Sequence, residues 1–182
     1  MKSKEVNYKL FLLANIIFSI GLGIFYPFWI LYIQKIGGSL ESFSIAVGLS
    51  IMASAISAYF FGSVSDKSGR KPIFIISGYS LAVIIFLYTF VSNVWQLYVL
   101  QIVQGILQTA YIMMESVFLA DITQKSTRGK NIGFYNMIMG IITALSVILS
   151  GFLISEQYFK GIFYVVSILI LISTTIMIKL KE

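Results

Sequence analysis

Histidine and cysteine are both absent from the sequence, and charged residues make up only 11% of its 182 positions. The chain therefore has no imidazole general base, no thiol nucleophile and no disulfide, and it lacks the side chains that hold most transition metals. Paired carboxylates within an apolar segment are missing as well. This composition argues against an enzyme, and we expect no catalytic residue, no metal and no other cofactor.

What the sequence has instead is apolar surface. Hydrophobic residues account for 58% of it, and the mean hydropathy is +0.93. A soluble domain of this length cannot bury so much apolar surface, so we expect an integral membrane protein in contact with lipid. The net charge of +6 does not indicate nucleic-acid binding, because the thirteen basic residues lie between apolar segments, where they set orientation.

The apolar residues fall into six segments, each near the roughly 20 residues that a helix needs to cross a bilayer. The sequence therefore predicts an all-α membrane protein, with residues 1–182 forming one domain of six transmembrane helices. The predicted spans are 10–33, 43–64, 72–91, 95–120, 132–154 and 162–178.

The basic residues predict the orientation of these spans. Eleven of the thirteen fall in the terminal segments and in the loops after the second and fourth spans, and only Lys35 and Lys160 fall on the opposite side. Loops rich in Lys and Arg stay in the cytoplasm. We therefore expect a multi-pass protein of the cell membrane with both termini cytoplasmic.

The fourth segment carries a polar stripe. Its members recur at steps of three and four, which places them on one face of a helix. They are Gln101, Gln104, Gln108, Tyr111 and Glu115. Facing lipid is excluded, since a charge alone costs about 3 kcal/mol at mid-bilayer. The stripe therefore lines a solute cavity, the interpretation that we adopt, or cross-links neighbouring helices through buried amides.

Glu115 is the only ionisable side chain well inside a predicted span. Such a group binds a proton or a cationic substrate, or it reaches the interface or pairs with a nearby base. In the first segment, Asn15 and Tyr26 lie along one helical face with Ser19 and Gly23. We place Asn15 and Tyr26 in the same substrate cavity, and the alternative is a polar face that neighbouring helices satisfy.

Other patterns carry structural predictions. Small residues recur at steps of four in the second segment and also mark one face of the fifth, where they allow close helix packing. The third segment has no charge and is expected to be peripheral and lipid-facing. Trp29 and Tyr32 end the first segment and Trp95 and Tyr98 open the fourth, and all four are expected to form an aromatic belt at the outer interface.

The loop 62–72 joins the second and third segments and is densely charged. Gly69 can adopt the positive φ that ends a helix, and Pro72 suits the first turn of the next one. Asp66 is unusual, because a carboxylate at the carboxyl end of a helix meets the negative end of its dipole. It needs a partner, either Arg70 across the turn or the amino terminus of another helix.

This loop resembles a signature of the major facilitator superfamily of secondary transporters. The matching pattern is Gly-x-x-x-Asp-Lys-x-Gly-Arg-Lys, with Gly62, Asp66, Gly69, Arg70 and Lys71. The loop 120–133 is similar to the family's next cytoplasmic connector, with Asp121 and Arg128 in register. The resemblance implies that these seven residues form a cytoplasmic gate, with Asp66/Arg70 and Asp121/Arg128 as paired charges. The alternative is that they are surface charges that contribute little.

The resemblance covers only the amino-terminal six-helix half of the family's twelve helices. It implies transport of a small solute by alternating access, with the second half supplied by a homodimer or a partner chain. The alternative is a truncated bundle that does not transport. Gln101 replaces an arginine that drug antiporters of the family often carry, and their Gly-Pro-x-x-Gly-Gly run is missing from the fifth segment. Both departures weaken a prediction of proton-driven efflux.

Overall fold

The computed structural model of the protein describes residues 2–152 and 159–180, and it describes side chains for 7–29, 31–65, 69–152 and 160–180. Six long helices follow one another in this part of the chain, and each is long and apolar enough to cross a membrane. They are α1 (Lys2–Lys35), α2 (Leu40–Ser68), α3 (Arg70–Leu87), α4 (Val94–Ile122), α5 (Arg128–Phe152) and α6 (Phe159–Ile178). Two short 3₁₀ helices, η1 (Tyr88–Phe90) and η2 (Lys125–Thr127), lie in the connections.

Local sequence sets several helix ends. Ser39 precedes α2 and its side chain accepts a hydrogen bond from the backbone N–H of Ser42, while Asn93 precedes α4 and accepts one from Gln96. These are the ordinary N-cap interactions of Ser and Asn. Gly69 has φ +78° between α2 and α3, the conformation expected from its place in the charged loop.

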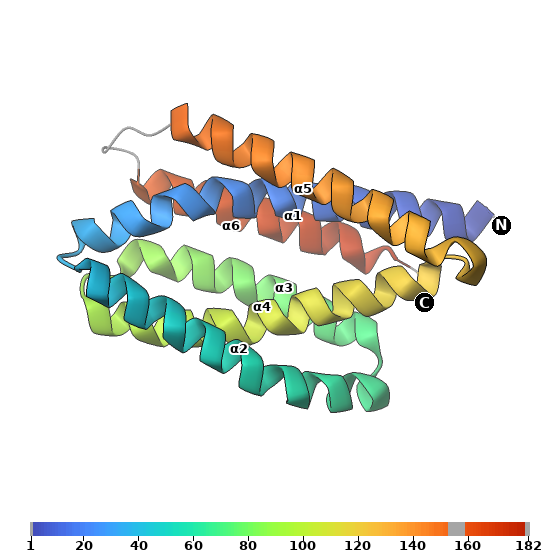
Figure 1. The fold of residues 1–182 in the computed structure, drawn as a ribbon, viewed down its shortest axis with the longest axis horizontal. Coiled ribbons are helices and arrows are strands. Elements are labelled where there is room, and N and C mark those ends of the chain that lie inside the picture. Colours follow the sequence, from blue (N-terminus) through green and yellow to red (C-terminus); the bar gives the residue numbers. More distant parts are fainter. Residues whose placement is uncertain (1, 153–158, 181–182) are drawn as a thin grey trace.

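The helices form an open arc. In order across it, α2 packs on α4, α4 on α3, α3 on α6, α6 on α1, and α1 on α5. Figure 1 shows α2 and α5 at opposite edges of the bundle. Exchanging the first three helices with the last three reverses this order but keeps the same neighbours, as expected for two inverted three-helix repeats.

The two ends of the bundle carry different connections (Figure 1). One end holds the start of α1, the α2–α3 turn, the α4–α5 turn and the end of α6; we call it the inner end, because the sequence predicts it to face the cytoplasm. The other end, the outer end, holds the α1–α2 and α3–α4 connections.

Glycines allow the closest helix crossings. A Cβ atom at Gly105 of α4 would lie 2.4 Å from the carbonyl oxygen of Ser50 on α2, and one at Gly23 of α1 would lie 2.8 Å from that of Thr143 on α5. The Ser54 hydroxyl on α2 donates to the carbonyl of Gly105 at 3.0 Å. The small-residue stripe of α2 therefore packs against α4 of the same chain.

Two expectations about the core are wrong. Trp29 and Tyr32 are buried at the outer end, where both rings contact Tyr88, so they belong to the core and not to an interfacial belt. The third helix is not merely peripheral, since half of its apolar window is buried between α4 and α6. Only its opposite face, with Ile76 and Val83, is exposed.

Candidate functional site

The polar stripe of α4 divides into a buried part and a partly exposed part. Gln101, Gln104 and Tyr111 are 5%, 7% and 0% exposed, whereas Gln108 and Glu115 are half-buried. The stripe thus keeps some contact with the surface of the bundle at two of its five positions.

Tyr111 joins α4 to α1. Its hydroxyl donates to Oδ1 of Asn15 at 3.1 Å, and the Asn15 amide nitrogen donates to the carbonyl of Phe11 at 3.0 Å. The Tyr111 ring also stacks on Phe18 with centroids 4.1 Å apart. The structure therefore brings together two residues that the sequence assigned to one site, Asn15 and Tyr111.

Gln104 joins α4 to the end of α3. Its Oε1 accepts a hydrogen bond of 2.6 Å from the hydroxyl of Tyr88, which lies in η1. Tyr88 is fully buried and was not singled out from the sequence. At this position the amide acts as a link between helices, the second of the two roles that the sequence left open.

Tyr26 lies apart from these buried groups. It is on the outer half of α1, and 55% of its side chain is exposed. Nearby on the same helix, Ser19 donates to the sulfur of Met139 on α5 at 3.4 Å. The first helix thus presents both bonded and exposed polar groups, and Tyr26 is among the exposed ones.

Glu115 meets a residue of α5. The hydroxyl of Tyr135 donates a short hydrogen bond to its carboxylate. Tyr135 is buried, and its ring packs on Phe11 with centroids 5.6 Å apart. Tyr135 was not identified as a site residue from the sequence. Its distance along the chain from the α4–α5 connection is a signal that could have found it. Glu115 is seven residues before the end of α4 and Tyr135 is seven after the start of α5, so both lie at the same depth in the bundle.

The charged loops meet at the inner end. Arg70, the first residue of α3, forms an ion pair with Asp121 near the end of α4. Among the described side chains, Asp121 is therefore paired with Arg70 and not with Arg128. The Nε atom of Arg128 is buried without a hydrogen-bond partner in that part of the chain. The side chain of Asp66 lies outside those that the structure describes.

Two other residues that the sequence assigned to a gate, Lys71 and Gly62, have structural contacts. The Lys71 ammonium donates to the carbonyl of Leu180 just beyond α6, so it ties the start of α3 to the end of α6. A Cβ atom at Gly62 would lie 3.8 Å from the Met113 side chain of α4. The inner ends of α3, α4 and α6 are thus held together by this loop.

Comparison with known protein families decides the identity of the fold. The profile described as Major Facilitator Superfamily matches residues 11–181, nearly the whole chain. The chain belongs to this superfamily. Six long apolar helices and an inverted-repeat order fit one half of a major facilitator protein, which makes the chain a multi-pass membrane protein of a transporter family.

Curated relatives of two lengths match this major facilitator chain. An uncharacterised MFS-type transporter of Bacillus subtilis, YitZ, is 29% identical over 85% of this chain and 94% of its own length. Another from that organism, YuxJ, is 27% identical over 91% of this chain but only 43% of its own length. The multidrug efflux pump PmrA of Streptococcus pneumoniae is 24% identical over 89% of this chain and 42% of that protein. The chain thus spans less than half of YuxJ and PmrA.

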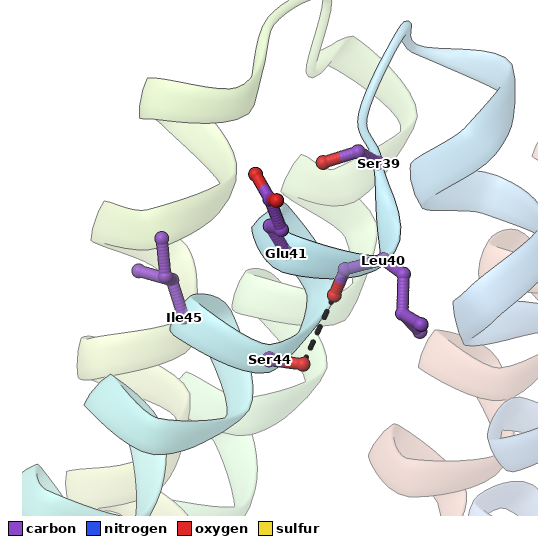
Figure 2. Close-up of a pocket in the computed structure, with 5 residues that line it drawn as sticks. All are labelled: Ser39, Leu40, Glu41, Ser44 and Ile45. Atoms are coloured by element: carbon purple, nitrogen blue, oxygen red, sulfur yellow. Dashed lines mark hydrogen bonds between the residues drawn. The ribbon is translucent and has the colours of Figure 1, made fainter.

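Two hollows mark the surface of this major facilitator half. One, of about 600 Å³, lies at the outer end around the start of α2 (Figure 2), where the Ser44 hydroxyl bonds the carbonyl of Leu40 beside Glu41. The other, of about 390 Å³, is a groove between α3 and α4. Neither is lined by the α4 stripe. The described residues contain no cluster of three acidic residues suited to a metal ion.

Proposed function

We propose that this chain is one six-helix half of a secondary active transporter for a small solute, and that it works by alternating access with a second half. The second half is another copy of the chain or a separate six-helix chain. One observation carries the proposal. Only 11% of the apolar window of α2 and of α5 is buried within the chain, against 39–50% for the other four helices.

The exposed face of α5 is suited to close contact with another protein. Gly133, Gly140 and Gly151 lie along this helix, and a Cβ atom at any of them would meet nothing within 4 Å. Ala144 and Asn136 on α5 are exposed as well. Faces of small residues are where helices approach one another in lipid, since packing is the driving force there. A second half seated on α2 and α5 gives these faces a partner.

A second half also completes the solute site. We propose that the cavity is lined by the α4 stripe with Asn15 and Tyr26, and that Tyr26, Gln108 and Glu115 contact the solute because they keep exposed surface. Gln104 and Tyr111 hold the walls together through their hydrogen bonds. Alternating access then follows from rocking of the two halves about this cavity.

The inner loops are proposed as the cytoplasmic gate. The residues are Gly62, Asp66, Gly69, Arg70, Lys71, Asp121 and Arg128. The Arg70–Asp121 pair supports this role, because it joins two loops far apart in sequence, and both side chains are accessible, at 37% and 49%. Exposed pairs contribute little to stability, so this one is free to exchange partners as the mouth opens.

The relatives add a direction of transport to consider. Besides PmrA, a Proteus mirabilis protein named multidrug resistance protein MdtG is 34% identical over 48% of this chain and 23% of its own length. These names favour export of drug-like solutes. A second candidate is a bundle without transport, favoured by the engagement of Gln104 and Tyr111 in bonds between helices.

The test combines cross-linking with transport. Because the chain has no cysteine, a double variant Met52→Cys/Met137→Cys places thiols on the exposed faces of α2 and α5 alone. The matched control, Val83→Cys/Ile168→Cys, places them on the exposed faces of α3 and α6. We expect oxidation in native membranes to give a covalent dimer for the first variant and monomer for the control.

Purified protein is then reconstituted in proteoliposomes and assayed for uptake and efflux of a solute panel. Transport that depends on Glu115 supports the proposal. Monomer in both cysteine variants, no co-purifying membrane chain and no flux of any solute would together leave the non-transporting bundle.

A further inference from the structure

Arg128 begins α5 at the inner end of the bundle, and one of its donors is left unused by the described part of the chain. The Nε atom is buried there without a hydrogen-bond partner. Asp121, the carboxylate seven residues before it, is taken by Arg70. A buried N–H group without an acceptor costs free energy, and more so when it carries charge. Arg128 therefore needs an acceptor from outside these residues, and its charge favours an anion.

The surroundings of Arg128 are strongly basic. Lys125, Arg128 and Lys130, which we call the inner basic cluster, lie within six positions, and no acidic residue occurs between 122 and 155. The terminal segments and loops predicted to face the cytoplasm hold eleven basic residues against four acidic ones. The four are Glu5, Asp66, Asp121 and Glu182. The chain's own carboxylates are too few to neutralise this end. Lys125 and Lys130 are exposed, so an anion from outside has access to the cluster.

The position of Arg128 along α5 matches the depth of lipid phosphates. The apolar run of the fifth predicted span begins at Ile132, four residues after Arg128, so the arginine lies about 6 Å outside the hydrocarbon at 1.5 Å per residue. The headgroup region of one leaflet is about 5–8 Å thick. The inner basic cluster therefore lies at the level of phospholipid headgroups.

A bulky apolar face of α5 continues from the cluster into the membrane. Beyond Lys130, large exposed side chains recur at steps of four and seven, which keeps them on one side of the helix. They are Phe134, Ile141, Leu145 and Phe152, each at least 51% exposed. This bulky face lies about a quarter turn from the small-residue face that we assign to a second half. It is therefore left for acyl chains.

From these observations we propose that the inner basic cluster binds the phosphate of an anionic phospholipid, with Arg128 donating to the phosphate oxygens and the acyl chains lying along the bulky face of α5. Basic segments beside a membrane span attract anionic lipids, and arginine binds phosphate through two N–H groups at once. A free phosphate ion satisfies the same donors but has no acyl chain to cover the bulky face. The proposal does not rest on the proposed function, because lipid binding needs neither a second half nor a solute.

The test measures lipid binding by native mass spectrometry, which needs no transport. Purified protein in detergent is titrated with three lipids of matched acyl chains: anionic phosphatidylglycerol, zwitterionic phosphatidylcholine, and diacylglycerol, which has no phosphate. A separate series adds millimolar inorganic phosphate. We expect saturable binding of phosphatidylglycerol, at least about fivefold weaker binding of phosphatidylcholine, none of diacylglycerol, and no displacement of lipid by inorganic phosphate.

Three variants locate the site. Arg128→Gln removes the charge and the Nε donor, so it should weaken phosphatidylglycerol binding at least about tenfold, the loss of one charged hydrogen-bonded contact. Lys130→Gln removes an exposed charge of the cluster and should weaken binding about fivefold. Lys160→Gln is the matched control, because it removes an exposed lysine at the outer end, near the start of α6, and should bind lipid as the wild type does. Size-exclusion profiles confirm that each variant is folded.

The outcomes are distinguishable from those of the proposed function. Equal binding of the three lipids, displacement by inorganic phosphate, wild-type affinity in Arg128→Gln, or an equal loss in Lys160→Gln would overturn the proposal. If Arg128→Gln keeps its lipid but abolishes the covalent dimer of Met52→Cys/Met137→Cys, the acceptor of Arg128 belongs to the second half and not to a lipid. Conversely, Arg128-dependent lipid binding in a protein with no dimer and no flux would support the lipid site and count against the carrier.

Discussion

Among the glycines of α2 and α4, Gly105 has the least space for an added Cβ atom. An alanine there would place its Cβ 2.4 Å from the carbonyl oxygen of Ser50, so the two helices would have to move apart. Overpacking of this kind costs about 1–3 kcal/mol. We predict that Gly105→Ala lowers the thermal unfolding midpoint in detergent by several degrees, measured by scanning fluorimetry.

Gly48 provides the matched control. It lies on α2, and a Cβ atom there would meet nothing within 4 Å. Alanine is favoured over glycine in a helix by about 1 kcal/mol, so Gly48→Ala should melt at the wild-type temperature or slightly above it. Equal midpoints for the two variants would mean that α2 and α4 cross less closely than described.

Individual residues differ in how far the sequence predicts them. The left-handed backbone at Gly69 follows from a charged turn between two apolar runs, so local chemistry is sufficient. The ion-pair partner of Asp121 could not be predicted from the neighbouring residues. Asp121 pairs with Arg70 of another loop and not with Arg128, the arginine nearest to it in sequence. Tyr135 escaped notice for the same reason, since its role depends on the carboxylate that faces it across a turn.

At the scale of elements, the outer end of α1 is fastened to the end of α3 by one side chain. The Tyr32 hydroxyl bonds the carbonyl of Tyr88 and also that of Val91, at 3.2 Å for the latter. The Tyr88 carbonyl keeps a hydrogen bond from the Val91 backbone N–H, so removing the hydroxyl costs about 1 kcal/mol, the net contribution of a lost hydrogen bond. We predict that Tyr32→Phe lowers the unfolding midpoint while the helical content at low temperature stays unchanged.

Tyr59→Phe is the comparison, because Tyr59 lies on α2 with 80% of its side chain exposed. Its loss of a hydroxyl should have no effect on melting. Circular dichroism with heating measures both variants under the same conditions. A Tyr32→Phe protein as stable as Tyr59→Phe would show that the aromatic packing around Tyr88 holds the outer end without the hydroxyl.

The elements themselves were easier to predict than their surroundings. Length and hydropathy are sufficient for six helices, and small residues correctly indicated a packed face on α2. Composition could not reveal that Trp29 and Tyr32 turn inward, because an aromatic residue near a span end suits both an interface and a core. The burial of α3 was missed because an uncharged helix satisfies lipid and protein neighbours equally.

At the scale of the whole molecule, the arc has two unpaired edges. Each of the middle helices packs on two neighbours, whereas α2 and α5 each pack mainly on one. These edges contact either lipid or a second six-helix unit. The match to 94% of YitZ and to 43% of YuxJ shows that this unit occurs in relatives of both lengths. Sequence could therefore predict the half and its fold, but the covering of its edges depends on a second surface.

Orientation is the prediction that involves the molecule as a whole. Eleven basic residues lie in the terminal segments and loops that the sequence assigns to the cytoplasmic side, against two on the other side, and this bias should hold the inner end in the cytoplasm, because Lys-rich and Arg-rich loops resist translocation. Ser126 in η2 and Ser92 before α4 are both exposed and lie at opposite ends. In intact cells, a membrane-impermeant maleimide should label Ser92→Cys, and it should label Ser126→Cys only after permeabilisation. The absence of native cysteine makes each signal specific.

Labelling of both variants from outside would indicate mixed insertion, which would bring two copies together in opposite directions and rule out the parallel second half on which the proposed cavity depends.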